Sequence, residues 1–425
     1  MDLAPPRGTQ DLLPPRSEAM LGLYEEAHRT ARLYGFRYME TPTFEHTELF
    51  ARTSGDTSDV VTKEMYTFDD KGGRSLTLRP ETTASVVRAY LTHAHDLGSP
   101  FKAYYVGPQF RHGRPQAGRT REFRQFGVEI LGVGSAAADV EVLALGERFV
   151  RERGLRDYVL HLNSIGDGAC RPGYRDKLVA YLERYRDQLD ADCRTRLEKN
   201  PLRVFDCKVD GEKDFVLAAP TITDNLCEPC AVHFSEVRTG LERAEIAYTV
   251  NPRLVRGLDY YTRTAFEWIS GVLAANKAGT INAGGRYDGL AEAIGGTPTP
   301  GVGFAMGLDR VLLAMEGEGS PLPAPRSVRC FVVALGETAR AAGDALVSDL
   351  RAAGIASAAA LEDRPMKAQL KMADRSGAMF AAILGDKELE QGAVTLRRLA
   401  DGIQKTVPIG DVKEWLTRLD DWAQA

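Results

Sequence analysis

The chain has 425 residues, of which 44% are hydrophobic and 27% charged, and its formal net charge is -5. This length predicts two or three domains with a large buried core, and the acidic balance excludes a nonspecific polycation, so a nucleic acid would have to be bound by local basic patches. The apolar runs fall short of the roughly 20 residues that a membrane-spanning helix needs. The first residues lack the basic and apolar parts of a secretory signal, so we expect a cytoplasmic protein with no membrane partner.

Hydrophobic periodicity predicts helices and strands in the first third of the chain. Residues 16–35 place apolar side chains at helical spacing and close on Gly35, a favourable C-cap. FRYMETPTFEH is expected to form a strand interrupted at Pro42, and SLTLRPETTASVVRAYLTHA a strand that turns at Pro80 into a helix. The arginine-rich segment FRHGRPQAGRTREFRQFGVEILG, residues 110–132, follows these elements.

The middle of the chain changes in character. A helix from about Val142 leads to YVLHLNSIG, a short buried strand, and then to a charged helical segment at residues 171–200. Strand-like alternation resumes in VNPRLVRGLDYYTRTAFEW, and GVGFAMGLDRVLLAM reads as a glycine-rich strand running into a helix. The charged helical part is therefore interpreted as an insertion into a strand-containing domain.

A linker rich in Pro, Gly and Ser, EGEGSPLPAPRS, separates this domain from alternating strands and helices that predict a compact α/β unit. We divide the chain into residues 1–315 with an insertion at about 167–248, a linker at 316–327 and a second domain at 328–425.

A row of side chains in the arginine-rich segment suggests a binding surface. If Thr120–Leu131 is a strand, alternate residues share one face: Arg121, Phe123, Gln125, Gly127 and Glu129. At roughly 3.3 Å per residue the row spans about 26 Å, enough for a nucleotide and a small molecule end to end. Arg forks bind phosphate, Phe can stack on a base, and Gly permits close approach of a ligand. The alternative is a solvent-facing strand with paired charges.

Other segments hold candidate ligands that could each be an ordinary turn or cap. RPETT places Glu81 at a strand-to-helix turn, either to hold a substrate ammonium or to cap the helix. Arg310 begins an apolar helix, where the backbone dipole and the guanidinium could act together on an anion. Two glycine-containing turns carry further polar residues: Arg256, Asp259, Tyr260 and Tyr261 in the first, and Arg286, Tyr287 and Asp288 in the second.

Together these segments resemble the histidyl-tRNA synthetase family of class II aminoacyl-tRNA synthetases, from RGTQDLLP near the start through the last domain. The arginine-rich segment is similar to the second class-defining motif and GVGFAMGLDR to the third, while VRGLDYY and GGRYDGL resemble the histidine-specific signatures. The resemblance implies an α+β catalytic domain, with an antiparallel sheet flanked by helices, a mostly helical insertion and a C-terminal α/β anticodon-binding domain.

The resemblance also implies the reaction and its partners. L-Histidine attacks the α-phosphorus of ATP to give histidyl-adenylate and diphosphate, and the histidyl group then moves to the 3′ end of histidine tRNA. ATP is a substrate, Mg²⁺ is expected with it although its protein ligands cannot be named, and the N-terminal region would supply much of a homodimer interface. No P-loop is present as another route to ATP.

Roles carried over by resemblance fall into three groups. Arg111 and Arg310 would hold the α- and γ-phosphate regions, Arg119 and Arg121 would assist the polyphosphate, Phe123 would stack on adenine, and Arg256 would stabilise charge on the α-phosphate. The α-amino group of histidine would be received by Glu81, Thr83 and Gln125, and the imidazole surrounded by Glu129, Tyr260, Tyr261 and Tyr287. Gln116 would contact the acceptor end of the tRNA, and in the last domain the candidates for RNA contact, or for solvated surface, are Arg375, Arg397 and Arg398.

Two questions stay open at this level. The insertion contains Cys207, Cys227 and Cys230, with Cys193 upstream and His233 downstream, but a single C-x2-C pair is a weak zinc signal, so reduced thiols are favoured and no metal ligand is assigned. The rival function is a non-catalytic, synthetase-like regulatory subunit of histidine biosynthesis. Such proteins typically lack the anticodon module and have degraded histidine signatures. Here VRGLDYY and the domain after the linker are both present, which favours catalysis.

Overall fold

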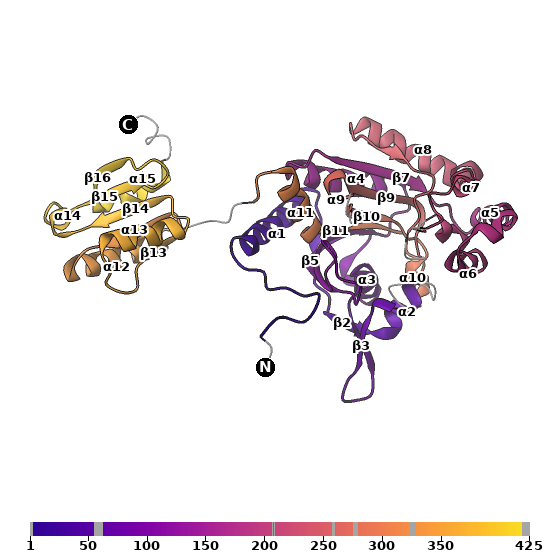
Figure 1. Ribbon diagram of the computed structural model, residues 1–425, viewed down its shortest axis with the longest axis horizontal. Helices are drawn as coiled ribbons and strands as arrows, with labels where there is room; N and C mark the ends of the chain where they lie inside the picture. The colour runs from indigo at the N-terminus through magenta and orange to yellow at the C-terminus, as the bar shows by residue number, and fades with distance from the viewer. Residues whose placement is uncertain are drawn as a thin grey trace. The chain divides into compact units, whose positions relative to one another are not determined.

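The computed structural model describes residues 3–54, 63–205, 207, 209–256, 260–274, 279–323 and 328–418. The chain divides into two compact units, Met1–Pro323 and Ala324–Ala425, each of which is described by itself (Figure 1). The last helix of the first unit, α11 (Leu308–Glu318), extends into the segment predicted as a linker, so residues 316–318 are helical. Within the described residues, none of the helices combines the length and apolarity needed to cross a lipid bilayer.

The first unit is built on an eight-stranded sheet. The strands are, in spatial order, β1 (Arg37–Tyr38), β5 (Phe101–Phe110), β6 (Glu122–Leu131), β11 (Gly301–Gly307), β10 (Thr280–Arg286), β9 (Thr262–Ser270), β7 (Tyr158–Ser164) and β8 (Thr249–Val250). The six inner strands pair antiparallel, as expected. The two short edge strands, β1 and β8, add parallel pairs that were not predicted.

Helices cover both faces of this sheet because its strands direct apolar side chains to each face. One face packs against α1 (Arg16–Leu33), α4 (Ala136–Glu152), α8 (Glu228–Arg243) and α11. Phe126, Val128 and Ile130 of β6 point into that core, as their spacing predicts. The other face packs against α3 (Thr83–Leu97), which contributes Val86 and Val87. The same face of β6 carries Gln125 and Glu129, so the polar row lies on the α3 side.

Smaller elements complete the first unit. A three-stranded antiparallel sheet has the order β2 (Phe44–His46), β4 (Ser75–Leu78), β3 (Tyr66–Asp69). The short helices around it and beside the large sheet are α2 (Thr47–Ser54), α9 (Gly271–Ala274) and α10 (Leu290–Ala293). The break between β1 and β2 falls at Pro42, and α3 begins just after Pro80, where the sequence predicts both events.

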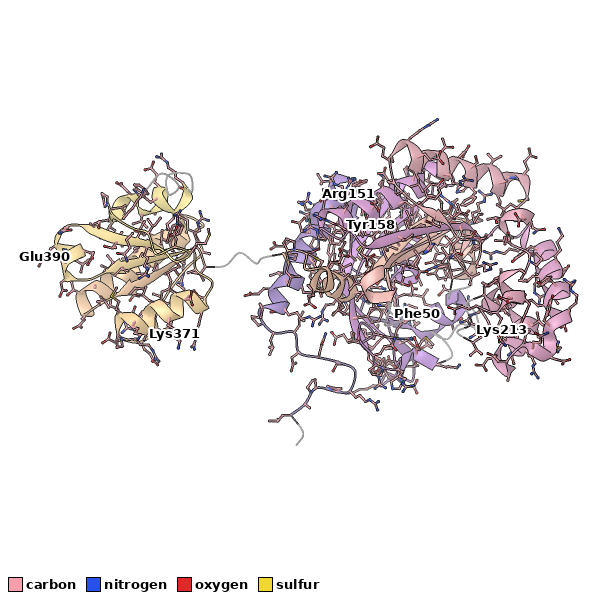
Figure 2. The ribbon with its side chains drawn as sticks, turned by 45° about the horizontal axis from the view of Figure 1, so that its top comes forward. Phe50, Arg151, Tyr158, Lys213, Lys371 and Glu390 are labelled. Carbon is pink, nitrogen blue, oxygen red and sulfur yellow. The ribbon has the colours of Figure 1, made fainter. Side chains whose placement is uncertain are left out.

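The segment between β7 and β8 is helical and has an apolar cluster of its own. It contains α5 (Arg171–Leu182), α6 (Ala191–Lys199) and α7 (Asp214–Leu217), with 3-10 turns η2 (Glu183–Gln188), η3 (Pro201–Val204) and η4 (Thr223–Asn225). Tyr174, Leu178 and Val216 are buried together within it. These helices lie together at one side of the first unit (Figure 1), and Lys213 marks the segment in the side-chain view (Figure 2).

The second unit is the compact α/β domain that the sequence predicts. Its sheet has the order β13 (Ser357–Ala359), β12 (Cys330–Ala334), β14 (Phe380–Leu384), β15 (Ala393–Arg398), β16 (Gln404–Pro408). The first three strands are parallel and the last two antiparallel. Its helices are α12 (Glu337–Ala352), α13 (Met366–Arg375), α14 (Asp386–Glu390), the 3-10 turn η5 (Ile409–Asp411) and α15 (Val412–Thr417).

Candidate active site

A cavity of about 470 Å³ opens in the first unit where the large sheet meets the start of α3. Its wall is formed by side chains and backbone from β6, β9, β10, β11 and the first turn of α11. Ten residues predicted to act at the site line it: Glu81, Thr83, Arg111, Arg119, Phe123, Gln125, Arg256, Tyr260, Tyr261 and Arg310. Segments far apart in the chain therefore meet in one concave space, which is where ligand sites usually occur.

Three arginines of this wall carry charges that repel one another. Arg111 donates from Nε to the Pro80 carbonyl oxygen at 2.8 Å, and Arg310 donates to the carbonyl oxygens of Gly118 and Thr280 at 2.8 and 2.7 Å. Burial lowers the pKa of Arg310, and the positive charges of Arg111 and Arg119 lower it further. Backbone bonds thus fix guanidinium groups close together, a geometry that an anionic ligand would stabilise.

Acidic partners balance part of this charge. Glu64 pairs with Arg119, and Glu267 lies 3.7 Å from Arg256 while also accepting the hydroxyl of Thr280. The guanidinium of Arg256 lies 5.4 Å from the centre of the Tyr261 ring, which holds it against an aromatic face. Asp259, predicted in the same turn, lies outside the described residues.

Polar acceptors lie in the same wall. Glu81 accepts the backbone N–H of Ala84 at 3.1 Å, so it caps α3, and its carboxylate also lines the cavity; the two interpretations of RPETT are compatible. Burial raises the pKa of Glu81. The Oε1 atom of Gln125 is buried and has no partner among the described residues. An acceptor that is buried without a donor is unfavourable unless a ligand supplies one.

Glu129 and Tyr287 lie beneath the wall rather than on it. The Thr83 hydroxyl donates to Glu129 Oε1 at 2.7 Å, and the Tyr287 hydroxyl donates to Oε2. Burial raises the pKa of Glu129 to about 8, although both hydrogen bonds oppose that shift. A Cβ atom at Gly303 would collide with this carboxylate, so the glycine of β11 makes room for it. The imidazole role predicted for Glu129 stays a prediction.

Some predicted residues are placed elsewhere. Arg121 precedes β6 and donates to the carbonyl oxygens of Arg7 and Gly113, so it does not continue the polar row into the cavity. Gln116 forms a backbone bridge with Arg119 in the turn beside the site. Arg286 is fully buried and binds Asp139 and Asp288, a structural role that its glycine-rich motif did not indicate.

Tyr105 is a residue that the sequence interpretation missed. It lies opposite Gly127 in the β5–β6 register, and a Cβ atom on Gly127 would collide with its ring. The space at Gly127 therefore belongs to Tyr105, which corrects the interpretation that this glycine admits a ligand. An aromatic residue paired with a strand glycine is a recognisable pattern once the register is known, but the register is not visible in a single strand.

A cavity that gathers arginines and acidic groups on a mainly antiparallel sheet, in a chain with a second α/β unit, is the arrangement expected of a class II aminoacyl-tRNA synthetase. Residues 8–311 match the family described as histidyl-tRNA synthetase, and residues 329–419 match the anticodon binding domain family. The chain belongs to the histidyl-tRNA synthetase family.

Individual relatives are similar to this chain over almost its whole length. A histidine–tRNA ligase from Moorella thermoacetica is 49% identical over 418 residues, covering 98% of each chain. One from Geobacillus thermodenitrificans is 47% identical over 413 residues, covering 97% of each. The crystal structure of apo Staphylococcus aureus histidyl-tRNA synthetase is 37% identical with a TM-score of 0.81 and covers 98% of this chain and 100% of that one.

Proposed function

We propose that this chain is a histidine–tRNA ligase that activates L-histidine with ATP and transfers the histidyl group to the 3′ end of histidine tRNA. The observation that carries the proposal is the composition of one cavity, in which Arg111, Arg119 and Arg310 lie with Glu81 and Gln125. These groups suit, respectively, a polyphosphate and the ammonium group of an amino acid. High identity to histidine–tRNA ligases over nearly the full chain favours catalysis over the regulatory alternative.

The first step is the attack of a histidine carboxylate oxygen on the α-phosphorus of ATP. The new P–O bond gives histidyl-adenylate as the bond to diphosphate breaks and its electrons leave with diphosphate. Arg111 and Arg310 bind phosphate oxygens, and Arg256 stabilises the charge that develops at the α-phosphate. Phe123 stacks on adenine; it already packs against Arg111, whose guanidinium is 5.3 Å from the ring centre. Catalysis of this kind depends on positioning and fixed charge.

Histidine is held by groups of both polarities. The α-amino group donates to Gln125 Oε1 and Glu81, since both residues line the cavity and Gln125 Oε1 has no donor among the described residues. The imidazole lies among Tyr260 and Tyr261, with Glu129 and Tyr287 beneath them. A site with these polar groups discriminates against amino acids that cannot pair with them.

Mg²⁺ accompanies ATP in this proposal. The wall carries the carboxylates of Glu267 and Asp309, and oxygen donors of this type suit Mg²⁺, which also keeps phosphate and water ligands. When bound, the ion screens the phosphate charge. The carboxylate of Asp309 also accepts the backbone N–H of Arg124 at 2.6 Å, so it ties the start of α11 to β6.

The remaining partners in this proposal are a second copy of the chain and the tRNA, and the proposed compartment is the cytoplasm. Phe44 and Phe68 are 50% and 44% exposed and pack edge to face on the small sheet, an apolar surface that suits a homodimer interface. Gln116 lies in the turn beside the cavity, where the acceptor end of the tRNA would arrive. The six cysteines are free thiols, which suits a reducing compartment.

The deciding measurement is ATP–diphosphate exchange with each standard amino acid offered singly. Exchange driven by histidine alone supports the proposal, and transfer to histidine tRNA then tests the second step. A folded protein that binds histidine but supports no exchange with any amino acid would instead be the regulatory subunit.

A further inference from the structure

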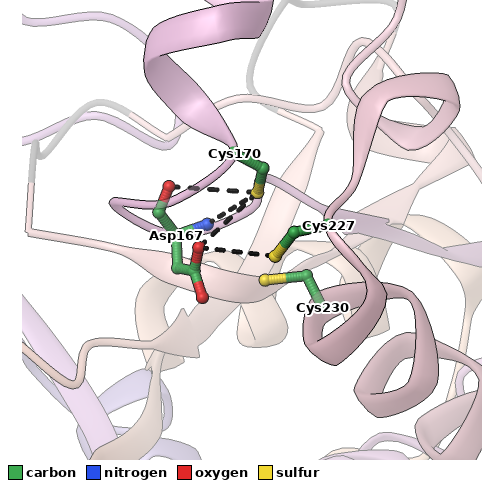
Figure 3. A group of neighbouring side chains, drawn as sticks. All are labelled: Asp167, Cys170, Cys227 and Cys230. Atoms are coloured by element: carbon green, nitrogen blue, oxygen red, sulfur yellow. Dashed lines mark hydrogen bonds between the residues drawn. The ribbon is translucent and has the colours of Figure 1, made fainter.

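We propose that Asp167, Cys170, Cys227 and Cys230 form a structural zinc site at the base of the helical segment α5–α7. One ligand atom from each residue lies within 4.8 Å of the others. The four side chains come from two separate parts of the chain and point toward one another (Figure 3). Three sulfurs and one carboxylate oxygen are donors that Zn²⁺ accepts in four-coordinate structural sites. The sequence drew attention to Cys227 and Cys230 together with Cys207; in the fold Cys207 lies in another cluster, and Asp167 and Cys170 join the C-x2-C pair instead.

The first pair is held by a turn that presents a sulfur. Asp167 and Cys170 are separated by two residues, and the Asp167 backbone N–H donates to Cys170 Sγ at 3.3 Å. Gly166 has φ +65°, and a Cβ atom there would lie 2.5 Å from Cys170 Sγ. Glycine is thus required both by the left-handed backbone and by the sulfur beside it.

The second pair opens a long helix. Cys227 is the N-cap residue of α8, and Cys230 lies in its first turn, also separated by two residues. Cys230 is fully buried and Cys170 is 8% exposed, so a bound ion would be shielded from water.

The distances require only a small contraction. With Zn–S bonds of about 2.3 Å, ligand atoms of a tetrahedral site lie about 3.8 Å apart, roughly 1 Å closer than the limit observed here. The Asp167 Oδ1 atom already accepts the thiols of Cys170 and Cys227 at 3.6 and 3.8 Å. Binding Zn²⁺ would release the three thiol protons to solvent. The site would then carry two negative charges, and the Arg263 guanidinium, 3.5 Å from Asp167 Oδ2, lies where it balances part of them.

A second cluster of similar spacing, Asp190, Cys193, Cys207 and Asp210, is a weaker candidate. It offers two sulfurs, and its carboxylates are already in use. Asp210 pairs with Lys213 at 2.7 Å and accepts the backbone N–H of Asp190 at 2.9 Å, while Asp190 caps α6 through the Cys193 N–H at 2.6 Å. This cluster is satisfied by the protein itself.

The position of the proposed site indicates what it would do. Residues 167–170 precede α5 and residues 227–230 begin α8, so one ion would join both ends of the segment α5–α7. Arg171, next to Cys170, donates to the carbonyl oxygens of Ile165 and Tyr261. The bound ion would therefore also restrain the backbone that leads into the proposed histidine pocket.

Zinc content of the full-length protein tests the proposal. Protein purified under reducing conditions is incubated with ZnCl₂, desalted and measured by elemental mass spectrometry; Co²⁺ replaces Zn²⁺ in a parallel sample, and its visible spectrum reports tetrahedral thiolate ligands. We expect about one equivalent per chain, lost in Cys230→Ser and retained in Cys193→Ser and in Cys330→Ser, a buried thiol of the second unit.

If Cys230→Ser fails to fold, Asp167→Asn replaces it as the test variant, since it keeps the size of the side chain. Asp167→Asn should retain the circular dichroism spectrum of the wild type and lose zinc on desalting. Absence of stoichiometric metal in the wild type, a Cys227–Cys230 disulfide in its place, or loss of zinc in Cys193→Ser alone would overturn the assignment. None of these readouts depends on aminoacylation.

Discussion

Two sets of buried arginines in the first unit differ in how their charge is balanced. Arg286 is fully buried and surrounded by compensation, with Asp139, Asp288 and two backbone carbonyl oxygens as partners. Burial alone would lower the pKa of Arg286, but the charges of Asp139 and Asp288 and their hydrogen bonds together outweigh it, and the pKa is raised. The cavity arginines Arg111 and Arg310 bond mainly to backbone oxygens, and their pKa values are lowered, first by burial.

The difference separates two uses of the same side chain. A buried cation whose partners are all within the protein belongs to the fold, because removing either member leaves an unpaired charge. A cation held in place among like charges, with its pKa depressed, is a candidate for binding an anion that the protein does not contain. The first variant below tests that distinction and the others extend it to the roles proposed at the cavity, from the largest expected effect to the smallest.

Replacing Arg286 should affect stability most. In Arg286→Gln the buried Asp139 loses its main partner, which is expected to reduce the free energy of unfolding by about 3–5 kcal/mol. Urea unfolding followed by circular dichroism measures it. Arg310→Gln is the matched control and should leave the unfolding midpoint unchanged or slightly raised, since it removes repulsion; equal losses in both variants would contradict the distinction.

Replacing Arg256 should affect catalysis most. Arg256→Ala is expected to lower histidine-dependent ATP–diphosphate exchange by about 10²–10³-fold while the unfolding midpoint stays close to that of the wild type. The exchange assay and thermal unfolding are run on the same preparation. Near-normal exchange in this variant would remove Arg256 from the proposed mechanism.

Glu129 provides the acidic counterpart of the comparison, since it is buried and no cation pairs with it in the part of the chain that the structure describes. With its pKa raised from 4.5 to about 8, the folded protein holds a proton that the unfolded chain releases. This contribution to stability is complete below pH 4.5 and is lost as the pH rises through 8. Glu129→Gln should therefore lose less stability than the wild type over this range, by on the order of 4 kcal/mol. Exposed Glu292→Gln is the control, and parallel pH profiles for all three proteins would show that Glu129 is ionised in the fold.

The smallest effect is expected at Gln116, outside both arginine sets. Gln116→Ala should raise the activation free energy of tRNA charging by a few tenths to about 1 kcal/mol, as for loss of a single hydrogen bond. ATP–diphosphate exchange without tRNA should stay unchanged. Steady-state charging at several tRNA concentrations measures the change, and a fall in exchange activity would place Gln116 in the adenylation site instead.

Sequence periodicity predicted the fold well because it acts locally. The alternation in β6 placed Phe126 in the core and Gln125 on the cavity face, and both are observed. The prediction that Arg121 shares this face is wrong, because the strand begins one residue later and the N-terminal Arg7–Gly8 segment binds that side chain. No pattern within the strand contains this contact.

Contacts between segments that are far apart in the sequence could not be predicted from local patterns. GGRYDGL resembles an ordinary turn, and only the packing of α4 shows that Arg286 pairs with Asp139. Cys170 lies far from Cys227 and Cys230 in the sequence, and only the return of the chain at α8 brings them together. Ten of the residues named through the family resemblance line the cavity, and their roles remain predictions for the variants above.

The order of strands in the large sheet has a consequence for synthesis of the chain. β6 pairs with β11, so one edge of the strand that carries the cavity floor has no partner until residues 301–307 have been made. The helices α5–α7, with their own apolar cluster, lie between the two in the sequence and can condense first. The nascent chain therefore exposes an unpaired edge for most of the time that the first unit is being translated, which is the interval when it is most open to mispairing and to chaperones.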